Sequence, residues 1–132
     1  MSVLPSHLHP TLCDLIGAPL PNGIDGVSFR PVIEGKAKDA RPELFFSYLN
    51  LQRAWRDDRY KLIRYPQVNL TQLFDLETDP DEMHDPSKEP AQADRIVQML
   101  AQLAKAQTHY GDSQSLTVAN PKPAAWTPPT GP

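Results

Sequence analysis

The sequence is poor in cysteine and lacks long apolar runs, and both shortages exclude whole classes of protein. Its 132 residues include a single cysteine, Cys13, which excludes an internal disulfide framework. No segment resembles the roughly 20 apolar residues of a membrane-spanning helix, so we expect no membrane partner. Met1-Ser-Val-Leu-Pro5 lacks the basic start and apolar stretch of a signal peptide. We therefore expect any export signal to lie outside this chain, and the localisation stays open.

Hydrophobic residues are also scarce. They make up 39% of the chain, below the usual 45–50% or so, which indicates that part of the chain is irregular or rests on another surface. A chain of this length buries roughly two-thirds of its unfolded surface, which is enough for one modest core but not for two large domains. The net charge of −3 favours no polyanionic partner.

Proline, in contrast, is abundant and unevenly placed. The chain has 15 prolines, about twice the expected number, and six lie in residues 1–42 and five in residues 121–132. Only Pro66 interrupts residues 43–79, where seven of the ten aromatic residues gather. This distribution predicts a folded centre between irregular arms. We expect a docking segment in residues 1–42, a folded subdomain in residues 43–112 and an extended proline-rich tail in residues 113–132, tied down by Trp126.

The centre is predicted to be an antiparallel sheet covered by one helix, which is an α+β fold. Short aromatic and β-branched runs separated by turns predict four strands, over residues 44–49, 51–56, 60–65 and 72–76. A long C-terminal helix is predicted from Pro90 to about His109. Its expected core-facing stripe is Ala93, Ile96, Val97, Leu100, Leu103 and Ala104, with Gln92, Arg95, Gln98, Gln102 and Lys105 outside.

The N-terminal arm is predicted to contain a two-turn helix over residues 10–17. Pro10 suits a first helical position and Gly17 a left-handed stop. Leu12, Leu15 and Ile16 fall on one face of this helix, which is too short to be stable without packing against something. Another helical turn is expected within residues 28–35.

No catalytic constellation is visible in the residues themselves. Residues 53–64 hold five basic side chains, but we expect these to pair with the acidic segment 75–89 rather than with nucleic acid. Asp75, Glu77 and Asp79 resemble a calcium loop only superficially, because Pro80 occupies the position that needs glycine. His7, His9 and Cys13 have no second cluster with which to hold a metal ion, and no nucleophile elbow or phosphate loop occurs. Asn69-Leu-Thr71 fits the glycosylation acceptor pattern, which is common by chance.

Several stretches together resemble the C-terminal region of the sulfatase family. His9-Pro-Thr-Leu-Cys-Asp-Leu-Ile-Gly17 and Pro21-Asn-Gly-Ile-Asp-Gly-Val-Ser28 resemble that family's Pro-Thr-Leu-x-Asp-Leu-x-Gly and Gly-x-Asp-Gly-x-Ser signature. Gln52–Arg64 is similar to its arginine-rich hairpin, residues 73–82 to the strand and turn that follow, and residues 116–126 to a tail of some bacterial members. One departure is His7, where the family often has aspartate.

The resemblance implies a smaller, non-catalytic subdomain of a sulfuric ester hydrolase. The family's chemistry relies on a formylglycine made from Cys/Ser-x-Pro-x-Arg and on a divalent cation, usually calcium, both expected only in a missing N-terminal domain. Cys13 is followed by Asp-Leu-Ile and does not match, so we expect no catalytic residue, metal ligand or cofactor in this chain and no activity from it alone. Tyr48, Gln52, Arg53 and Arg56 are the candidate substrate-cleft contacts in a full-length enzyme; otherwise they are sheet surface, paired with Asp75 or Asp79. The expected partner is the missing N-terminal domain or a second copy in a homodimer. The alternative function is a stand-alone oligomeric interaction module.

Overall fold

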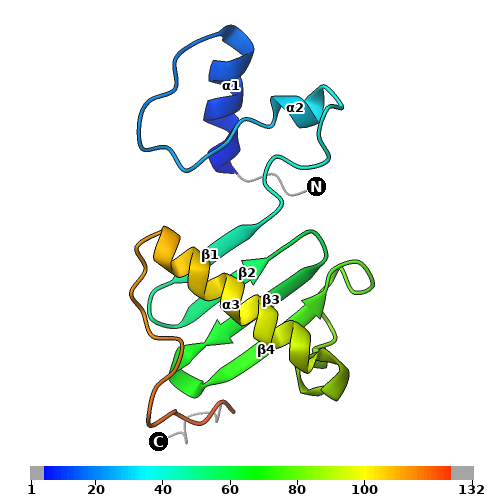
Figure 1. Cartoon of the computed structure of the whole chain (residues 1–132), viewed down its shortest axis with the longest axis vertical. Helices are drawn as coiled ribbons and strands as arrows, with labels where there is room; N and C mark the ends of the chain where they lie inside the picture. The colour runs from blue at the N-terminus through cyan, green and yellow to red at the C-terminus, as the bar shows by residue number, and fades with distance from the viewer. Residues whose placement is uncertain (1–4, 126–132) are drawn as a thin grey trace, which may run out of the picture. The chain divides into compact units, whose positions relative to one another are not determined.

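A computed structural model describes residues 5–125 of the chain, which divides into two compact units, Met1–Pro42 and Glu43–Pro132. Each unit has its own secondary structure (Figure 1), and they are described separately below. None of the helices in the described part is both long enough and apolar enough to cross a lipid bilayer.

The C-terminal unit is built on a four-stranded antiparallel sheet, which confirms the predicted fold class. Its strands are β1 (Leu44–Tyr48), β2 (Gln52–Arg56), β3 (Tyr60–Tyr65) and β4 (Leu70–Asp75), in the order β1-β2-β3-β4. Asp57 fixes the turn between β2 and β3, because its carboxylate accepts hydrogen bonds from the backbone N–H groups of Arg59 (2.8 Å) and Tyr60 (2.6 Å).

Strand β4 begins at Leu70, two residues earlier than the sequence pattern indicates. A 3₁₀ turn over Pro66–Val68 and a left-handed Asn69 (φ 49°) reverse the chain directly after β3. Asparagine tolerates this conformation better than most residues, so the reversal is tight and Leu70 already pairs with Tyr65.

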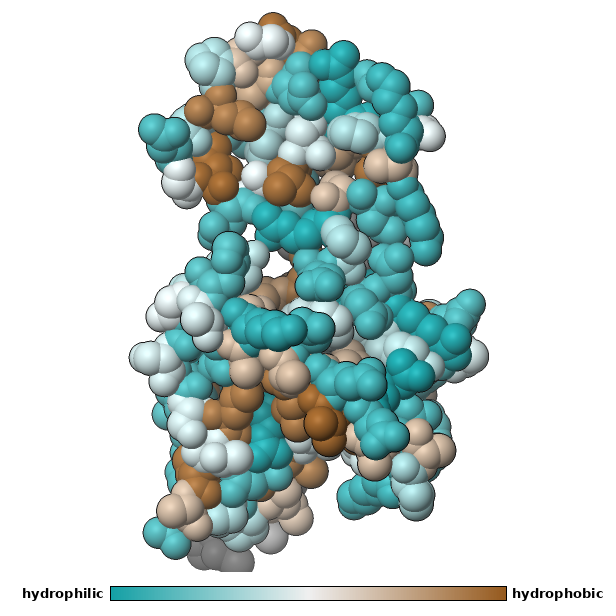
Figure 2. All heavy atoms as spheres, in the orientation of Figure 1, coloured by the Kyte–Doolittle hydropathy of each residue, from teal (hydrophilic) through white to brown (hydrophobic). Residues whose placement is uncertain are grey.

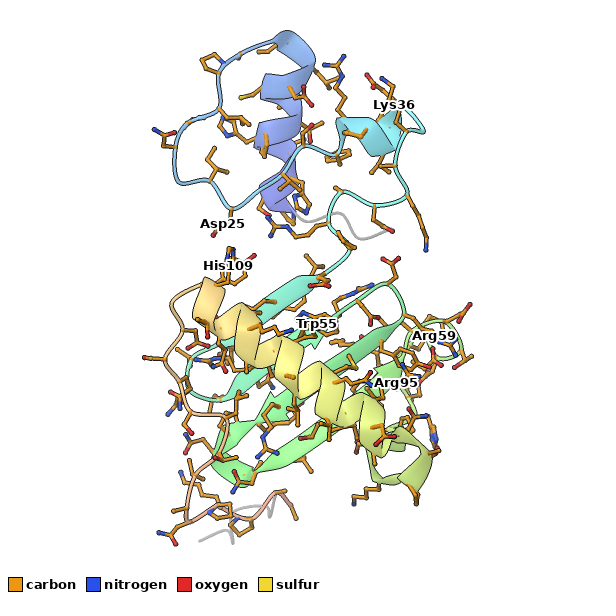
Figure 3. All side chains as sticks on the ribbon, viewed as in Figure 1. Asp25, Lys36, Trp55, Arg59, Arg95 and His109 are labelled. Atoms are coloured by element: carbon orange, nitrogen blue, oxygen red, sulfur yellow. The ribbon has the colours of Figure 1, made fainter. Side chains whose placement is uncertain are left out.

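Helix α3 (Ala93–His109) follows a 3₁₀ turn at Pro90–Gln92 and lies across one face of the sheet (Figure 1). The side chains at its centre form the core with those of β2, β3 and β4, and Trp55 of β2 lies beneath the helix (Figure 3). The buried members of this core are Trp55, Tyr60, Leu62, Leu73, Met99 and Leu103.

The face of α3 that is buried is rotated from the predicted one. Met99 and Leu103 are buried, whereas Val97 is 67% exposed. Ala93 and Ala104 are exposed too. Arg95, expected outside, lies with its guanidinium carbon 3.7 Å from the centre of the Tyr60 ring. An arginine that stacks on an aromatic ring shares the covered side of a helix without losing its charge, so counting only aliphatic residues misplaced the stripe.

The segment after α3 is held against the sheet by polar side chains. Arg64 donates to the carbonyl of Leu116 (2.7 Å), and the Asn69 amide both donates to the Val118 carbonyl (2.8 Å) and accepts from its N–H (3.1 Å). Farther along, the Lys122 N–H donates to the Gln67 carbonyl. The Asn69 side chain thus pairs with Val118 as a neighbouring strand would. Trp126, the expected anchor, lies outside the described residues.

The N-terminal unit contains a 3₁₀ turn (Pro5–His7), helix α1 (Leu8–Ile16) and helix α2 (Arg30–Ile33). Gly17 ends α1 in the left-handed conformation (φ 70°), as predicted. The helix begins at Leu8 rather than at Pro10. Pro10 is still within the first turn, where its missing N–H leaves no hydrogen bond unmade.

Candidate functional site

Strand β2 separates the four predicted cleft residues onto two faces of the sheet. Side chains alternate along a strand, so Gln52 and Arg56 lie on the face opposite Arg53 and the core residue Trp55. Tyr48 of β1 is paired directly with Gln52 and shares its face. The structure therefore places Tyr48, Gln52 and Arg56 on the helix-free face and Arg53 on the helix-covered one. Tyr48 and Gln52 are neighbours, whereas Arg56 lies at the other end of β2, opposite Leu44.

Arg53 has little hydrogen-bonding capacity left for a ligand, because all three of its side-chain nitrogen atoms already donate within the chain. Its side chain is 6% exposed, its Nε and Nη2 donate to the Asp112 carboxylate at 2.5 and 3.0 Å, and its Nη1 donates to the Leu49 and Gln52 carbonyls. The hydrogen bond from Arg53 holds the pKa of Asp112 well below its usual range. Gln107 also donates to this carboxylate (2.9 Å). Arg53 thus ties β2 to the end of α3.

The helix-free face offers groups suited to binding rather than to chemistry. Tyr48 is 60% exposed, and Gln52 and Arg56 are half-buried. The Arg56 Nε donates only a long hydrogen bond to the Asp57 carbonyl (3.4 Å), and within residues 5–125 its guanidinium forms no ion pair with a carboxylate. An arginine in this state is available to an oxyanion, and an exposed phenol beside an amide suits a hydroxyl-rich ligand. The face holds no nucleophile with an adjacent base.

Two side chains of the basic hairpin, Arg59 and Lys61, pair with the acidic segment as the sequence indicates. Arg64 does not, and donates instead to the Leu116 carbonyl and to the side chains of Thr71 and Asn69. Arg59 bridges Asp75 (2.7 Å) and Glu77 (2.9 Å), and Lys61 bridges Glu82 (2.7 Å). The hydrogen bond from Arg59 lowers the pKa of Asp75 to about 2. Arg59 and Arg95 both approach the ring of Tyr60, and Figure 3 shows them near one another. These contacts pair the charges of Arg59 and Lys61, and leave those of Arg56 and Arg64 without a carboxylate partner among the ion pairs of the described residues.

The predicted partners of Arg53 and Arg56 are wrong in detail. Asp75 pairs with Arg59, and the Asp79 carboxylate accepts from the backbone N–H groups of Met83 and His84 at 3.0 and 2.7 Å. These turn contacts, led by the His84 N–H, lower the pKa of Asp79. Asp112, the actual partner of Arg53, lies 59 residues away along the chain, and no local spacing signals that contact.

The described residues do not fit a metal ion. No group of three or more His, Cys, Asp or Glu side chains in residues 5–125 is placed to hold one. In the N-terminal unit, Cys13 Sγ lies 3.7 Å from His9 Nε2, and His7 is fully buried with its Nδ1 accepting from the Val27 N–H (3.1 Å).

The Asn69 amide of the glycosylation pattern is engaged in hydrogen bonds with the Val118 backbone.

The family-like signature in the N-terminal unit forms a clasp, which we define as α1, residues 22–29 and the start of α2. Thr11 Oγ1 accepts from the Phe29 N–H (3.0 Å), and Ser28 Oγ donates to the Asp14 carboxylate (2.6 Å). Gly26 lies so close to the start of α1 that an added Cβ would lie 1.9 Å from the Ser6 carbonyl oxygen. Thr, Asp, Gly and Ser at these positions therefore hold the loop on the helix.

Directly before the clasp, the histidine that departs from the family pattern supplies the acceptor that a carboxylate would supply. His7 Nδ1 receives the Val27 N–H, so the neutral ring carries its proton on Nε2. That Nε2 is buried and has no hydrogen-bond partner in the described part of the chain. In α1 itself the buried residues are Pro10, Thr11 and Cys13.

The apolar side of α1 is the exposed one. Leu8, Leu12, Leu15 and Ile16 are between 50% and 77% exposed, and Leu20 and Ile33 of the same unit are at least half exposed. Hydrophobic residues reach the surface of this unit in Figure 2. Exposure of this many large apolar side chains on one short segment is unusual for a free surface and is typical of an interface.

Comparison with known proteins agrees with this fold and signature. The chain belongs to the family described as N-sulphoglucosamine sulphohydrolase, C-terminal, whose model matches residues 2–109. It is 32% identical to a Delta 4,5-hexuronate-2-O-sulfatase of Bacteroides thetaiotaomicron over 92% of this chain, and 27% identical to an N-acetylglucosamine-6-O-sulfatase of the same organism over 79%. The crystal structure of a putative sulfatase from Bacteroides thetaiotaomicron matches with a TM-score of 0.71 and 29% identity over 88% of this chain. The predicted sulfatase resemblance is confirmed.

The match is to one end of much longer proteins. The chain spans 27% and 21% of the two curated relatives and 27% of the putative sulfatase. What is matched is the C-terminal region, which carries the sheet and the long helix.

Proposed function

We propose that this chain acts as the C-terminal subdomain of a sulfuric ester hydrolase and is non-catalytic by itself. Two observations carry the proposal. The family model matches residues 2–109, and the chain covers only about a quarter of the length of its relatives. In this proposal the formylglycine and the calcium ion belong to an N-terminal catalytic domain. Cys13 is a poor formylglycine precursor because it is buried in α1 and Asp14-Leu15-Ile16 follows it.

The proposed partner of the clasp is that catalytic domain. Helix α1 buries Pro10, Thr11 and Cys13 and leaves its large apolar residues exposed, so Leu12, Leu15 and Ile16 need a covering surface that the N-terminal unit does not provide. Burial of one such side chain contributes about 1.5–3 kcal/mol, and several together give a stable contact between domains.

The proposed role of the helix-free face is to line one side of the substrate cleft. Tyr48 and Gln52 suit sugar hydroxyls, and Arg56 suits a sulfate or carboxylate. The curated relatives are named for sulfated hexuronate and N-acetylglucosamine, and we infer a sulfated saccharide as the substrate class here. Arg53 takes no part in binding in this proposal, because Asp112 and two carbonyls occupy its donors.

A chimeric enzyme tests the proposal. The C-terminal quarter of the Delta 4,5-hexuronate-2-O-sulfatase is replaced by this chain. Circular dichroism of the chimeric protein reports whether it folds, and hydrolysis of the parent enzyme's own substrate reports whether it is active. We expect a folded, active chimera, whereas Leu12→Asp with Ile16→Asp abolishes assembly. A chimera that folds but gives no turnover would count against the assignment.

Variants of the active chimera then test whether the helix-free face of the sheet binds the substrate. Arg56→Ala is expected to raise KM about tenfold with little change in kcat, because it removes a charge-assisted contact made in the bound state. Lys105→Ala, at an exposed position of α3, is the matched loss of a cation and is expected to leave both constants unchanged. If both variants changed KM equally, Arg56 would have no specific role in substrate binding.

A further inference from the structure

The outer edge of β1 is open, whereas the other edge of the sheet is protected. β1 and β4 are the two outer strands. On β4, the Leu73 N–H donates to the Asp85 carboxylate (3.0 Å), and the 3₁₀ turn Pro86–Lys88 packs against the strand with Pro86 buried. Among residues 5–125, no backbone hydrogen bond joins β1 to anything other than β2 and its own turn.

The sequence of β1 carries none of the devices that usually block an open edge. Leu44-Phe-Phe-Ser-Tyr-Leu49 contains no charge and no proline, and charged residues, prolines and bulges are what normally prevent one edge from pairing with another. The register with β2 is continuous from Leu44 to Tyr48, so no bulge twists the edge away.

Apolar side chains are exposed along the same edge. Phe46, Tyr48, Leu49 and Leu51 are 39%, 60%, 70% and 45% exposed, respectively. Leu49 is also held in the left-handed conformation (φ 47°), which is uncommon for a leucine. Unpaired backbone groups and exposed aromatic residues therefore coincide on one strand and its turn.

We propose that β1 pairs antiparallel with β1 of a second copy of this chain, joining two four-stranded sheets into one of eight strands. β1 is self-complementary about Phe46. An antiparallel pair centred there places Phe46 against Phe46 and Leu44 against Tyr48, all on the helix-free face and without a charge clash. Because β4 is covered, pairing through β1 closes at two chains and does not extend into a fibre.

This inference concerns a surface separate from the apolar face of α1, and it does not depend on the proposed function. An extended strand from another protein would use the same backbone groups, but the uncharged and symmetric pairing of β1 favours a second copy.

Light scattering with size-exclusion chromatography on the full chain tests the proposal over a range of concentrations. We expect a dimer for the unmodified chain and a monomer for Phe46→Lys, which places two ammonium groups against each other at the centre of the pair. Val97→Lys adds the same charge at an exposed apolar site of α3 and is expected to remain dimeric. The expected rise in the dimer dissociation constant for Phe46→Lys is about tenfold or more.

A cross-link provides the second measurement, in case Phe46→Lys fails to fold. Residues directly opposite each other in an antiparallel pair have Cβ atoms about 4.5–5.5 Å apart, so Phe46→Cys in a Cys13→Ser background should form an intermolecular disulfide under mild oxidation. Val97→Cys in the same background should not. The proposal is overturned by a monomer at all concentrations, or by a dimer that Phe46→Lys leaves intact. It is also overturned if only Leu12→Lys breaks the dimer, which would assign association to α1.

Discussion

At the scale of single residues, Arg53 and Asp112 form the least exposed of the ion pairs described. Their side chains are 6% and 16% exposed. Asp112→Asn keeps the shape but leaves a buried guanidinium without its counter-charge, so we expect a loss of about 3 kcal/mol in the free energy of unfolding. The midpoint of urea-induced unfolding measures this loss of stability. Asp81→Asn, at an exposed position, is the control and should change stability by less than about 0.5 kcal/mol. Equal midpoints for both variants would mean that the pair contributes nothing.

The same carboxylate predicts sensitivity to acid. Hydrogen bonds from Arg53 and Arg59 depress the pKa of Asp112 and that of Asp75, the latter to about 2. An unfolded aspartate takes up its proton near pH 4, so the unfolded state binds more protons between about pH 4 and pH 2. Stability is therefore expected to be constant above about pH 5 and to fall as the pH is lowered through that window. The loss of stability on acidification should be smaller for Asp112→Asn than for the unmodified chain. Identical profiles of stability against pH for the two proteins would contradict this.

Gly26 is required by close packing and not by its backbone angles. A methyl group at this position would overlap the Ser6 carbonyl and approach Pro10 Cγ at 2.9 Å. Gly26→Ala is expected to loosen the clasp, so that the Val27 and Phe29 amides exchange with deuterium about tenfold faster or more. Gly23→Asn is the matched control, because nothing lies near that Cβ and asparagine tolerates its positive φ. Unchanged amide exchange in Gly26→Ala would contradict the clasp.

At the scale of secondary-structure elements, the buried side of α3 separates residues that look alike in sequence. Leu103 is fully buried in the core, and Val97 is 67% exposed. Leu103→Ala should lower the free energy of unfolding by about 2–5 kcal/mol, whereas Val97→Ala should change it by less than about 0.5 kcal/mol. Chemical denaturation of the two variants measures both. A large loss of stability in Val97→Ala would mean that Val97 is buried, as the sequence pattern predicted.

The sequence could predict the strands and helices but not the rotation of α3 or the partner of Arg53. Alternation and turn residues are local signals, so the sheet and its order follow from them. The contact of Arg95 with Tyr60 and that of Arg53 with Asp112 depend on how distant segments meet. Alternation alone separates Arg53 from Gln52 and Arg56, yet it does not say which face the helix covers. That choice removes Arg53 from the candidate site.

At the scale of the whole molecule, the low hydrophobic content has a structural counterpart. The C-terminal unit buries its own core between the sheet and α3, whereas the N-terminal unit is held by polar contacts and leaves most of its large apolar side chains exposed. We therefore expect residues 43–132 to fold by themselves, and we propose that the clasp is the part that needs a partner. The sequence indicated this division, because its proline-poor aromatic centre and its proline-rich arm differ in composition.

The central claim is that the chemistry of the proposed hydrolase belongs to a catalytic domain and not to these 132 residues. The most direct measurement is turnover of an aryl sulfate by the purified chain, with and without added calcium, beside an intact sulfatase as the positive control. We expect no release of the phenol above buffer under either condition. Release that scales with the concentration of the chain, and that survives repurification, would contradict it and would require an active site among the residues described here.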